Sequence, residues 1–243
     1  MKTYWQNYID GTWVDGGAGR IDVFNPGTGE KLAEQSLADA GDVDRAVMAA
    51  QRVHLSGALA DLRPVERGRM VQAMGRYLID HIDEIAQVLT LEQGKPLWEA
   101  RIEVEGAARY FEYYGNQAET VEGRSIPLGK GYFDFTTYEP FGVSAQIIPW
   151  NYPIEMTARS LSAALATGNA CVIGAWMGLG CNALGLDDML GGRPPRLVTL
   201  NINFFAPFLR EFLLMHGVCS CSRRAILSLL RRGENVGLVV GGS

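Results

Sequence analysis

Apolar residues recur at helical spacing in three stretches of the first half of the chain. The stretch 43–53 follows Asp42, a residue type that caps helix N-termini, so we expect a helix that starts there. Pro64 suits the first turn of a second, long helix that continues until Gly94 ends it. A third helix is expected over 98–114, and we interpret its aromatic face as a core stripe. The pattern therefore predicts a helical layer.

Alternating patterns predict strands before and after these helices in the sequence. Asp10-Gly11 lies between Tyr8, Ile9, Trp13 and Val14, which predicts a short hairpin near the start of the chain. The stretch 132–140, "YFDFTTYEP", alternates aromatic or Thr with polar positions, which predicts a half-exposed strand on one side of a second hairpin.

A strand, a helix and a strand follow in order. "GVSAQIIPW" is typical of a buried strand that ends at Pro149, 154–167 of a helix rich in small residues, and "NACVI" of a second buried strand. This order predicts a βαβ unit of a parallel sheet. Beyond Gly174 we expect strands over 196–204 and 235–241, with helices between them.

Composition narrows the class of protein. Of 243 residues, 47% are apolar and 20% charged, and the net charge is -5, which describes a globular chain without the basic surface that attracts nucleic acid. We expect no nucleic-acid partner. The four cysteines are too few for a disulfide framework, and the first residues lack the apolar core of a signal peptide, so we expect a cytoplasmic protein.

One segment raises the question of a membrane. Residues 160–186 carry no charged side chain and are long enough to cross a bilayer. Five glycines interrupt the segment, and Thr167-Gly168-Asn169 is typical of a helix stop. We therefore favour a buried helix, turn and strand over a membrane span.

Five ordered motifs carry a resemblance to a known family. They are "FNPGTGE", "RPVERGR", "LEQGKP", "YEPFGVSAQIIPWNYP" and "ALATGNACVI". Residues 1–173 resemble the N-terminal part of the NAD(P)-dependent aldehyde dehydrogenase superfamily. The resemblance implies an α/β chain with a partial aldehyde-dehydrogenase-like fold: helices, an oligomerisation-type hairpin and an incomplete parallel sheet. It also implies NAD or NADP as cofactor and a small aldehyde as substrate.

The resemblance assigns four site residues. It makes Asn151 the donor that stabilises the oxyanion of the thiohemiacetal, and Ile148, Pro149 and Trp150 the wall of the cofactor site. An Asn at the carboxyl edge of a parallel sheet suits this role, because ligands bind there and an amide donates without adding charge. Through the strand at 132–140, the resemblance further implies a homo-oligomer or a complex with a dehydrogenase subunit.

The sequence departs from the family beyond Ile173. The family has a Lys that contacts the adenosine ribose at the position of Gly174, and no later segment matches its nucleotide-binding Gly-rich turn, its catalytic Glu or its nucleophilic Cys. Cys171 lies within an expected buried strand, where a thiol is usually a small apolar side chain. We therefore predict impaired cofactor binding and no aldehyde oxidation.

Residues 174–243 resemble a different family. "LREFLLMHGVCSCSRRAI", with Arg210, Glu211 and Cys219, and the terminal "VVGG" are similar to a segment of the diacylglycerol and monoacylglycerol acyltransferases. The His-Pro-His-Gly element of that family is absent. We therefore expect a truncated dehydrogenase region, 1–173, joined as a chimera to a short α/β acyltransferase-like tail, 174–243.

Other candidates have simpler interpretations. His216, Cys219 and Cys221 are too close together to close a tetrahedral metal site, so we expect no metal. We interpret His54 and His81 as packed or solvated side chains. Four arginines at 223–224 and 231–232 favour a solvated helix face over contact with lipid headgroups.

Two alternatives to an inactive dehydrogenase relative stay open. The tail keeps open an acyltransferase-related protein associated with the endoplasmic reticulum membrane. The strand at 132–140 keeps open a non-catalytic partner of a full-length dehydrogenase.

Overall fold

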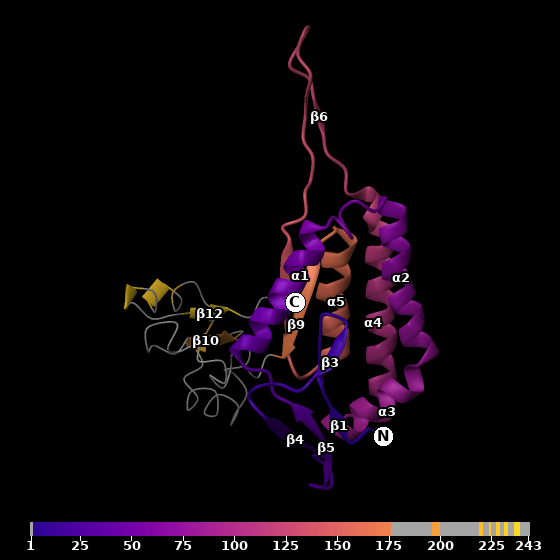
Figure 1. Cartoon of the computed structure of the whole chain (residues 1–243), viewed down its shortest axis with the longest axis vertical. Coiled ribbons are helices and arrows are strands. Elements are labelled where there is room, and N and C mark those ends of the chain that lie inside the picture. Colours follow the sequence, from indigo (N-terminus) through magenta and orange to yellow (C-terminus); the bar gives the residue numbers. More distant parts are fainter. Residues whose placement is uncertain are drawn as a thin grey trace. The chain divides into compact units, whose positions relative to one another are not determined.

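The computed structural model describes residues 2–175, 196–199, 219–220, 224, 227–228, 231–232 and 236–238. The chain divides into two compact units, Met1–Trp176 and Met177–Ser243. The strands of the first unit are β1 (Tyr4–Trp5), β2 (Asn7–Ile9), β3 (Thr12–Val14), β4 (Arg20–Phe24), β5 (Lys31–Ser36), β6 (Ser125–Ile126), β7 (Asp134–Phe135), β8 (Val143–Ile148) and β9 (Ala170–Ala175). Its helices are α1 (Ala40–Leu55), α2 (Pro64–Asp80), α3 (Ile82–Gln93), α4 (Leu97–Gln117) and α5 (Pro153–Ala166), as Figure 1 shows.

The first hairpin has the predicted turn. β2 and β3 pair antiparallel, and Asp10 (φ 50°) and Gly11 (φ 78°) join them. Positive φ at both central residues of a two-residue loop defines a type I′ turn, which Asp-Gly favours. The predicted hairpin is confirmed.

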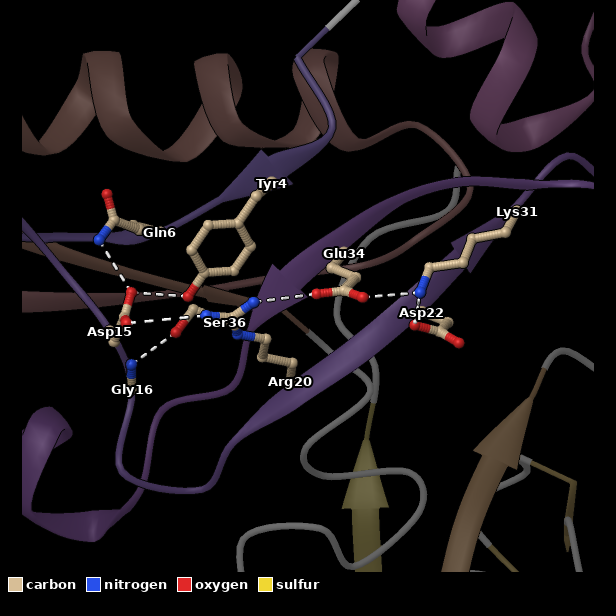
Figure 2. Close-up of polar contacts among 9 residues, drawn as sticks. All are labelled: Tyr4, Gln6, Asp15, Gly16, Arg20, Asp22, Lys31, Glu34 and Ser36. Atoms are coloured by element: carbon tan, nitrogen blue, oxygen red, sulfur yellow. Dashed lines mark hydrogen bonds and ion pairs between the residues drawn. The ribbon is translucent and has the colours of Figure 1, made fainter.

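A ladder of charged side chains crosses the sheet β1-β5-β4 (Figure 2). Arg20 donates to Glu34 at 3.1 Å, and Lys31 contacts both Glu34 and Asp22 at 2.7 Å. The Tyr4 hydroxyl donates to Asp15 at 2.6 Å. These groups are largely exposed, so water screens the pairs and each adds little stability.

Helix α1 begins earlier than predicted. Asp39 is the N-cap, and its carboxylate accepts from the Asp42 amide at 2.8 Å, while the Asp42 carboxylate accepts from the Asp39 amide at 2.9 Å. This reciprocal arrangement is a capping box, so the assignment of Asp42 as the N-cap was wrong by one turn. The cause is that 40–42 contain no large apolar residue to extend the periodic pattern. Asp42 also accepts from the Gly17 amide at 2.7 Å.

The long helix expected between Pro64 and Gly94 is two helices. His81 (φ -116°, ψ 19°) ends α2 and begins α3, because its backbone leaves the helical region. Pro64 lies in the first turn of α2, and Gly94 (φ 75°) ends α3 in the left-handed conformation, both as predicted.

Helices α2 and α4 approach closely through small residues. A Cβ added to Gly68 would collide with the carbonyl oxygen of Gly115, and one added to Gly75 would lie 2.8 Å from that of Ala108. The contact therefore requires glycine. A core of apolar residues from α2, α4, α5 and the 3₁₀ turn after α4 surrounds it: Val71, Ala107, Phe111, Ala118, Ala158 and Ala166.

The predicted βαβ unit is confirmed. β8 and β9 run parallel, with Val143 opposite Ala170 and Ile148 opposite Ala175, and α5 connects them. Helices α1 and α5 both pack against these strands. The strands are less buried than predicted, since Ile147 and Ile173 are each 51% exposed. Among the described residues this sheet has two strands, so each of them is an edge.

A hairpin arm, residues 121–141, projects from the helices of the first unit (Figure 1). Within it β6 and β7 pair antiparallel, with Ser125 opposite Phe135, which confirms the predicted hairpin. The half-exposed strand was wrong: β7 has two residues, and Phe133 and Phe135 are both exposed. No element among the residues that the structure describes covers them, so the alternation does not mark a core there.

The second unit contributes three short strands to the described residues. β10 (Arg196–Thr199) pairs parallel with β11 (Cys219–Ser220) and with β12 (Val236–Leu238). The strands expected at 196–204 and 235–241 are confirmed in these parts, and the helix expected at 207–217 lies outside the described residues. Among the helices that the structure describes, none is long and apolar enough to cross a membrane.

Candidate functional site

The predicted site residues lie on one loop at the carboxyl edge of the two-stranded sheet. β8 ends at Ile148, opposite the end of β9 at Ala175, and the loop then passes through Pro149, Trp150 and Asn151 before α5 begins. Ile148 is buried, Trp150 is 68% exposed and Asn151 is exposed. The four residues are thus together, on the edge where α/β folds bind ligands. The oxyanion role of Asn151 and the cofactor-wall role of the other three stay predictions.

Side chains at the end of α3 and in the segment that follows it donate to the backbone of this loop. The Gln93 side-chain amide donates to the Trp150 carbonyl at 2.6 Å. The Lys95 ammonium donates to the Asn151 carbonyl at 3.0 Å. Two consecutive carbonyl groups of the loop therefore have donors more than fifty residues away in the sequence.

Lys95 reaches the loop as part of a buried ion pair with Glu103 of α4. The Lys95 side chain is 10% exposed and that of Glu103 is 0% exposed. The second carboxylate oxygen of Glu103 accepts from the Ile154 amide at 3.1 Å. This amide is one of the first of α5, which have no partner within the helix, so Glu103 caps α5 from outside.

Acidic groups surround the loop. The Tyr152 hydroxyl donates to Glu99 at 2.8 Å, and this bond raises the pKa of Tyr152. Partial burial raises the pKa of Glu92, which also lies near Glu103, although Gln93 and Lys95 oppose the shift. The Lys95 ammonium lies 4.3 Å from the centre of the Tyr152 ring. Tyr152 therefore stays protonated at neutral pH, and Lys95 supplies the positive charge.

Cys171 is the one cysteine of residues 1–175, and it does not join Asn151. It lies opposite Ser144, four residues before the Ala175 end of β9. At ~3.3 Å per residue, this places it about 13 Å from the edge along the strand. Burial raises the pKa of its thiol to about 11, so the thiol is protonated at neutral pH.

The described residues fit a nicotinamide cofactor only in part. Ile148, Pro149 and Trp150 lie together at the sheet edge, where the resemblance predicts a cofactor wall, but Gly174 stands where it implies a ribose-contacting Lys. Among the described residues no atom lies within 4 Å of a Cβ built on Gly174, and glycine has no side chain that could donate to a ribose. The described residues thus give no complete nucleotide site.

Lys95, Glu103 and Gln93 were missed by the sequence analysis. The sequence marks "LEQGKP" as a helix end and as a family motif, but neither interpretation gives its Gln or Lys a role at the site. One signal was present: Glu103 occurs on the apolar stripe of α4, between the buried residues Ala100 and Ala107. A carboxylate at such a position needs a cationic partner, and Lys95 is nearby in sequence.

The other residues that the sequence singled out either lie away from the Asn151 loop or fall outside the described residues. His54 is half-buried, with its ring near Gly142, and His81 stacks on Tyr77 with ring centres 4.0 Å apart, so both are packed. Among the described residues no group of three or more His, Cys, Asp or Glu side chains is placed to hold a metal ion. Cys219 begins β11, while Arg210, Glu211, His216 and Cys221 lie outside the described residues.

Comparison with known proteins identifies the family. The model of the Aldehyde dehydrogenase family matches residues 13–175, and the chain belongs to this family. The chain is 38% identical over 168 residues to the putative aldehyde dehydrogenase DhaS of Bacillus subtilis. This matched stretch covers 68% of this chain and 34% of the relative. The chain is 36% identical over 173 residues to human retinal dehydrogenase 2, covering 70% and 33%.

Solved structures agree with this assignment. The first unit resembles the crystal structure of PnpE in complex with nicotinamide adenine dinucleotide, at a TM-score of 0.68 and 38% identity, over 72% of this chain and 36% of that one. The chain spans about a third of the length of the curated relatives it matches. A second family model, Diacylglycerol acyltransferase, matches residues 168–243 and overlaps the first on β9.

Proposed function

We propose that this chain is a member of the aldehyde dehydrogenase family that keeps the oxyanion-donor loop but does not oxidise aldehydes. One observation carries the proposal: the Asn151 loop is in place at the sheet edge, whereas the thiol of the same unit, Cys171, is partly buried, protonated and about 13 Å from that edge along β9.

The chemistry explains why this separation matters. Oxidation of an aldehyde in this family starts when a thiolate attacks the carbonyl carbon, and an oxyanion donor contributes only when charge develops beside it. Asn151 alone has no such charge to stabilise. The donor loop is therefore necessary for the family reaction but insufficient for it.

We further propose that the dehydrogenase region ends near Ile173, and that 174–243 is an acyltransferase-like tail joined to it as a chimera. Support comes from the overlap of the two family matches on 168–175 and from Gly174 at the position of the family's Lys. On composition, we propose a cytoplasmic location. NAD or NADP would bind weakly, because the wall of Ile148 to Trp150 lacks that Lys.

An NADH-formation assay tests the proposed inactivity. The purified chain, given NAD and a panel of small aldehydes, should produce no NADH above a protein-free blank, with a full-length aldehyde dehydrogenase as positive control. Steady turnover that survives further purification and disappears in Asn151→Ala would overturn the proposal.

A separate titration tests the cofactor site. Gly174→Lys places the ribose-contacting side chain in open space and should bind NADH more tightly than the natural chain, measured by the fluorescence of the nucleotide. Gly174→Met is the matched control for added bulk without charge. If the natural chain binds NADH as tightly as a full-length dehydrogenase, the proposed impairment is wrong.

The arm supports a second function, that of a non-catalytic partner. Phe133, Phe135 and Tyr138 are 81%, 58% and 70% exposed, and β7 resembles the strand through which the family oligomerises. The strand would pair with a second copy of this chain or with a full-length dehydrogenase subunit. Co-purification with such a subunit, lost in Phe135→Pro, is the expected result, and failure to co-purify would remove the idea.

A further inference from the structure

We propose that Lys95 and Glu103 are positioning residues for Asn151: their ion pair holds the backbone from the Asn151 carbonyl to the Ile154 amide and keeps the loop ordered without a bound ligand. The inference rests on the proposed function only in taking Asn151 as the oxyanion donor. The contacts themselves do not depend on catalysis.

The two contacts lie at the ends of the backbone segment that begins at Asn151. The Lys95 ammonium donates to the carbonyl of Asn151 at 3.0 Å, and the Glu103 carboxylate accepts from the amide of Ile154 at 3.1 Å. The same two side chains bind each other. One ion pair therefore fixes the carbonyl at the start and the amide at the end of a four-residue segment, while the Asn151 side chain itself stays exposed.

Energetics argue that stability alone does not explain the pair. Moving two charges out of water is costly, and apolar residues of similar volume often replace a buried ion pair at no loss of stability. The neighbours of Glu103 on α4, Ala100 and Val104, are apolar and fully buried. What a charged pair adds at this position is directional: it bonds to polar backbone atoms of the loop, which apolar side chains cannot do.

Only a change to both residues separates positioning from stability. Removing Lys95 alone leaves a buried carboxylate without its partner, which destabilises the whole unit and confuses the two effects. The double variant Lys95→Met with Glu103→Gln removes both charges, preserves volume, and keeps an amide oxygen that accepts from Ile154. It breaks the bonds from Lys95 to Glu103 and to the Asn151 carbonyl.

The test measures loop order directly by NMR. In the natural chain we expect backbone order parameters of ~0.85 for residues 150–154, and in the double variant below ~0.6, with the core helices unchanged. Amide exchange at Ile154 should accelerate about tenfold. Thermal unfolding shows whether the double variant is folded at the measuring temperature.

Two further variants complete the experiment. Lys95→Arg keeps the charge and a donor, so it should retain the ordered loop. Arg101, on α4 like Glu103, forms an exposed pair with Asp83 of α3 at 2.8 Å, and Arg101→Met should break this pair and leave the loop as it is in the natural chain. Should the folded double variant keep the loop order of the natural chain, the proposal is wrong.

The NMR test of the positioning role does not depend on whether the chain oxidises aldehydes. Aldehyde turnover by the natural chain would contradict the proposed inactivity and leave the positioning role standing. An ordered loop in the double variant would contradict the positioning role and leave the proposed inactivity standing.

Discussion

The hairpin arm of the first unit, residues 121–141, and the rest of that unit, called the body here, differ in how far they bury aromatic side chains. In the body, Phe111 of α4 is 5% exposed and packs among small side chains from three helices. In the arm, Phe133 and Phe135 contact each other, with ring centres 5.5 Å apart, but are otherwise open to water. The body also has exposed apolar side chains, such as Trp98 at 65%, but it has a buried core, whereas the arm has none and exposes side chains of the kind that interfaces bury.

The same contrast applies to polar groups. The Asn151 loop belongs to the body and has its backbone carbonyls held by Gln93 and Lys95. The arm returns to the body at Gly142, whose amide donates to the Asn169 side chain at 3.0 Å. The backbone of the donor loop is therefore held by other residues of this chain, whereas among the described residues the aromatic side chains of the arm have no such partners.

Truncating one aromatic residue in each region should give the largest effect. Phe111→Ala should lower the free energy of unfolding by about 3–5 kcal/mol, because it removes a buried ring from the core. Phe135→Ala is the matched control and should change it by less than ~0.5 kcal/mol. Urea unfolding of both variants checks this, and a large loss in Phe135→Ala would show that the arm stabilises the folded unit.

Thiol reactivity gives the next largest contrast. At pH 8, Cys171, with a pKa of about 11, should react with iodoacetamide about a hundredfold more slowly than an ordinary exposed thiol. Phe133→Cys supplies that exposed thiol in the arm. Peptide mass spectrometry over time measures both rates, and equal rates would contradict the protonated state on which the proposed inactivity rests.

Glycine substitutions on two helices should separate a close approach from open space. Gly68→Ala should destabilise the body by about 1–3 kcal/mol, because the new methyl group collides with the Gly115 carbonyl of α4. Gly106→Ala on α4 is the control, since its Cβ would lie 3.6 Å from the nearest atom of Glu155, and it should stabilise by up to about 1 kcal/mol. Thermal unfolding checks both, and a neutral Gly68→Ala would mean that the two helices can separate at little cost.

Periodicity predicted the elements of the body because each helix buries one face against a partner in the same chain. It failed at His81, where the apolar spacing continues across a change of backbone direction. It also failed in the arm, since an alternating strand has the same pattern whether its partner lies in the chain or outside it. A sequence pattern records that a face is apolar but not what covers the face.

The candidate site was located by its motif and not by its supports. Asn151 follows a strand, so the local sequence places it at a sheet edge. Lys95 and Glu103 act from other elements, and their meeting with the loop depends on how α4 packs against α5. Only Glu103 could have indicated such a contact from the local sequence, because it is a charged residue on an apolar stripe.

The smallest expected effect concerns acid stability at the start of α1. The amides of Gly17 and Asp39 bond to the Asp42 carboxylate and hold its pKa below the ordinary value of 3.8. A carboxyl whose pKa is lowered by folding stabilises the protein above its unfolded-state pKa, and this contribution is lost as the pH falls through the folded-state value. Asp42→Asn keeps an acceptor but removes the charge, so it should melt at a lower temperature than the natural chain at pH 7.

The difference between the two chains should then shrink as the pH falls below about 4, where the natural carboxylate takes up its proton. Melting temperatures of both chains from pH 7 to pH 2.5 check this. A constant difference across that range would show that Asp42 acts through the geometry of the capping box alone. A difference that closes would show that the charge of Asp42, bonded to the amides of Gly17 and Asp39, stabilises the start of α1.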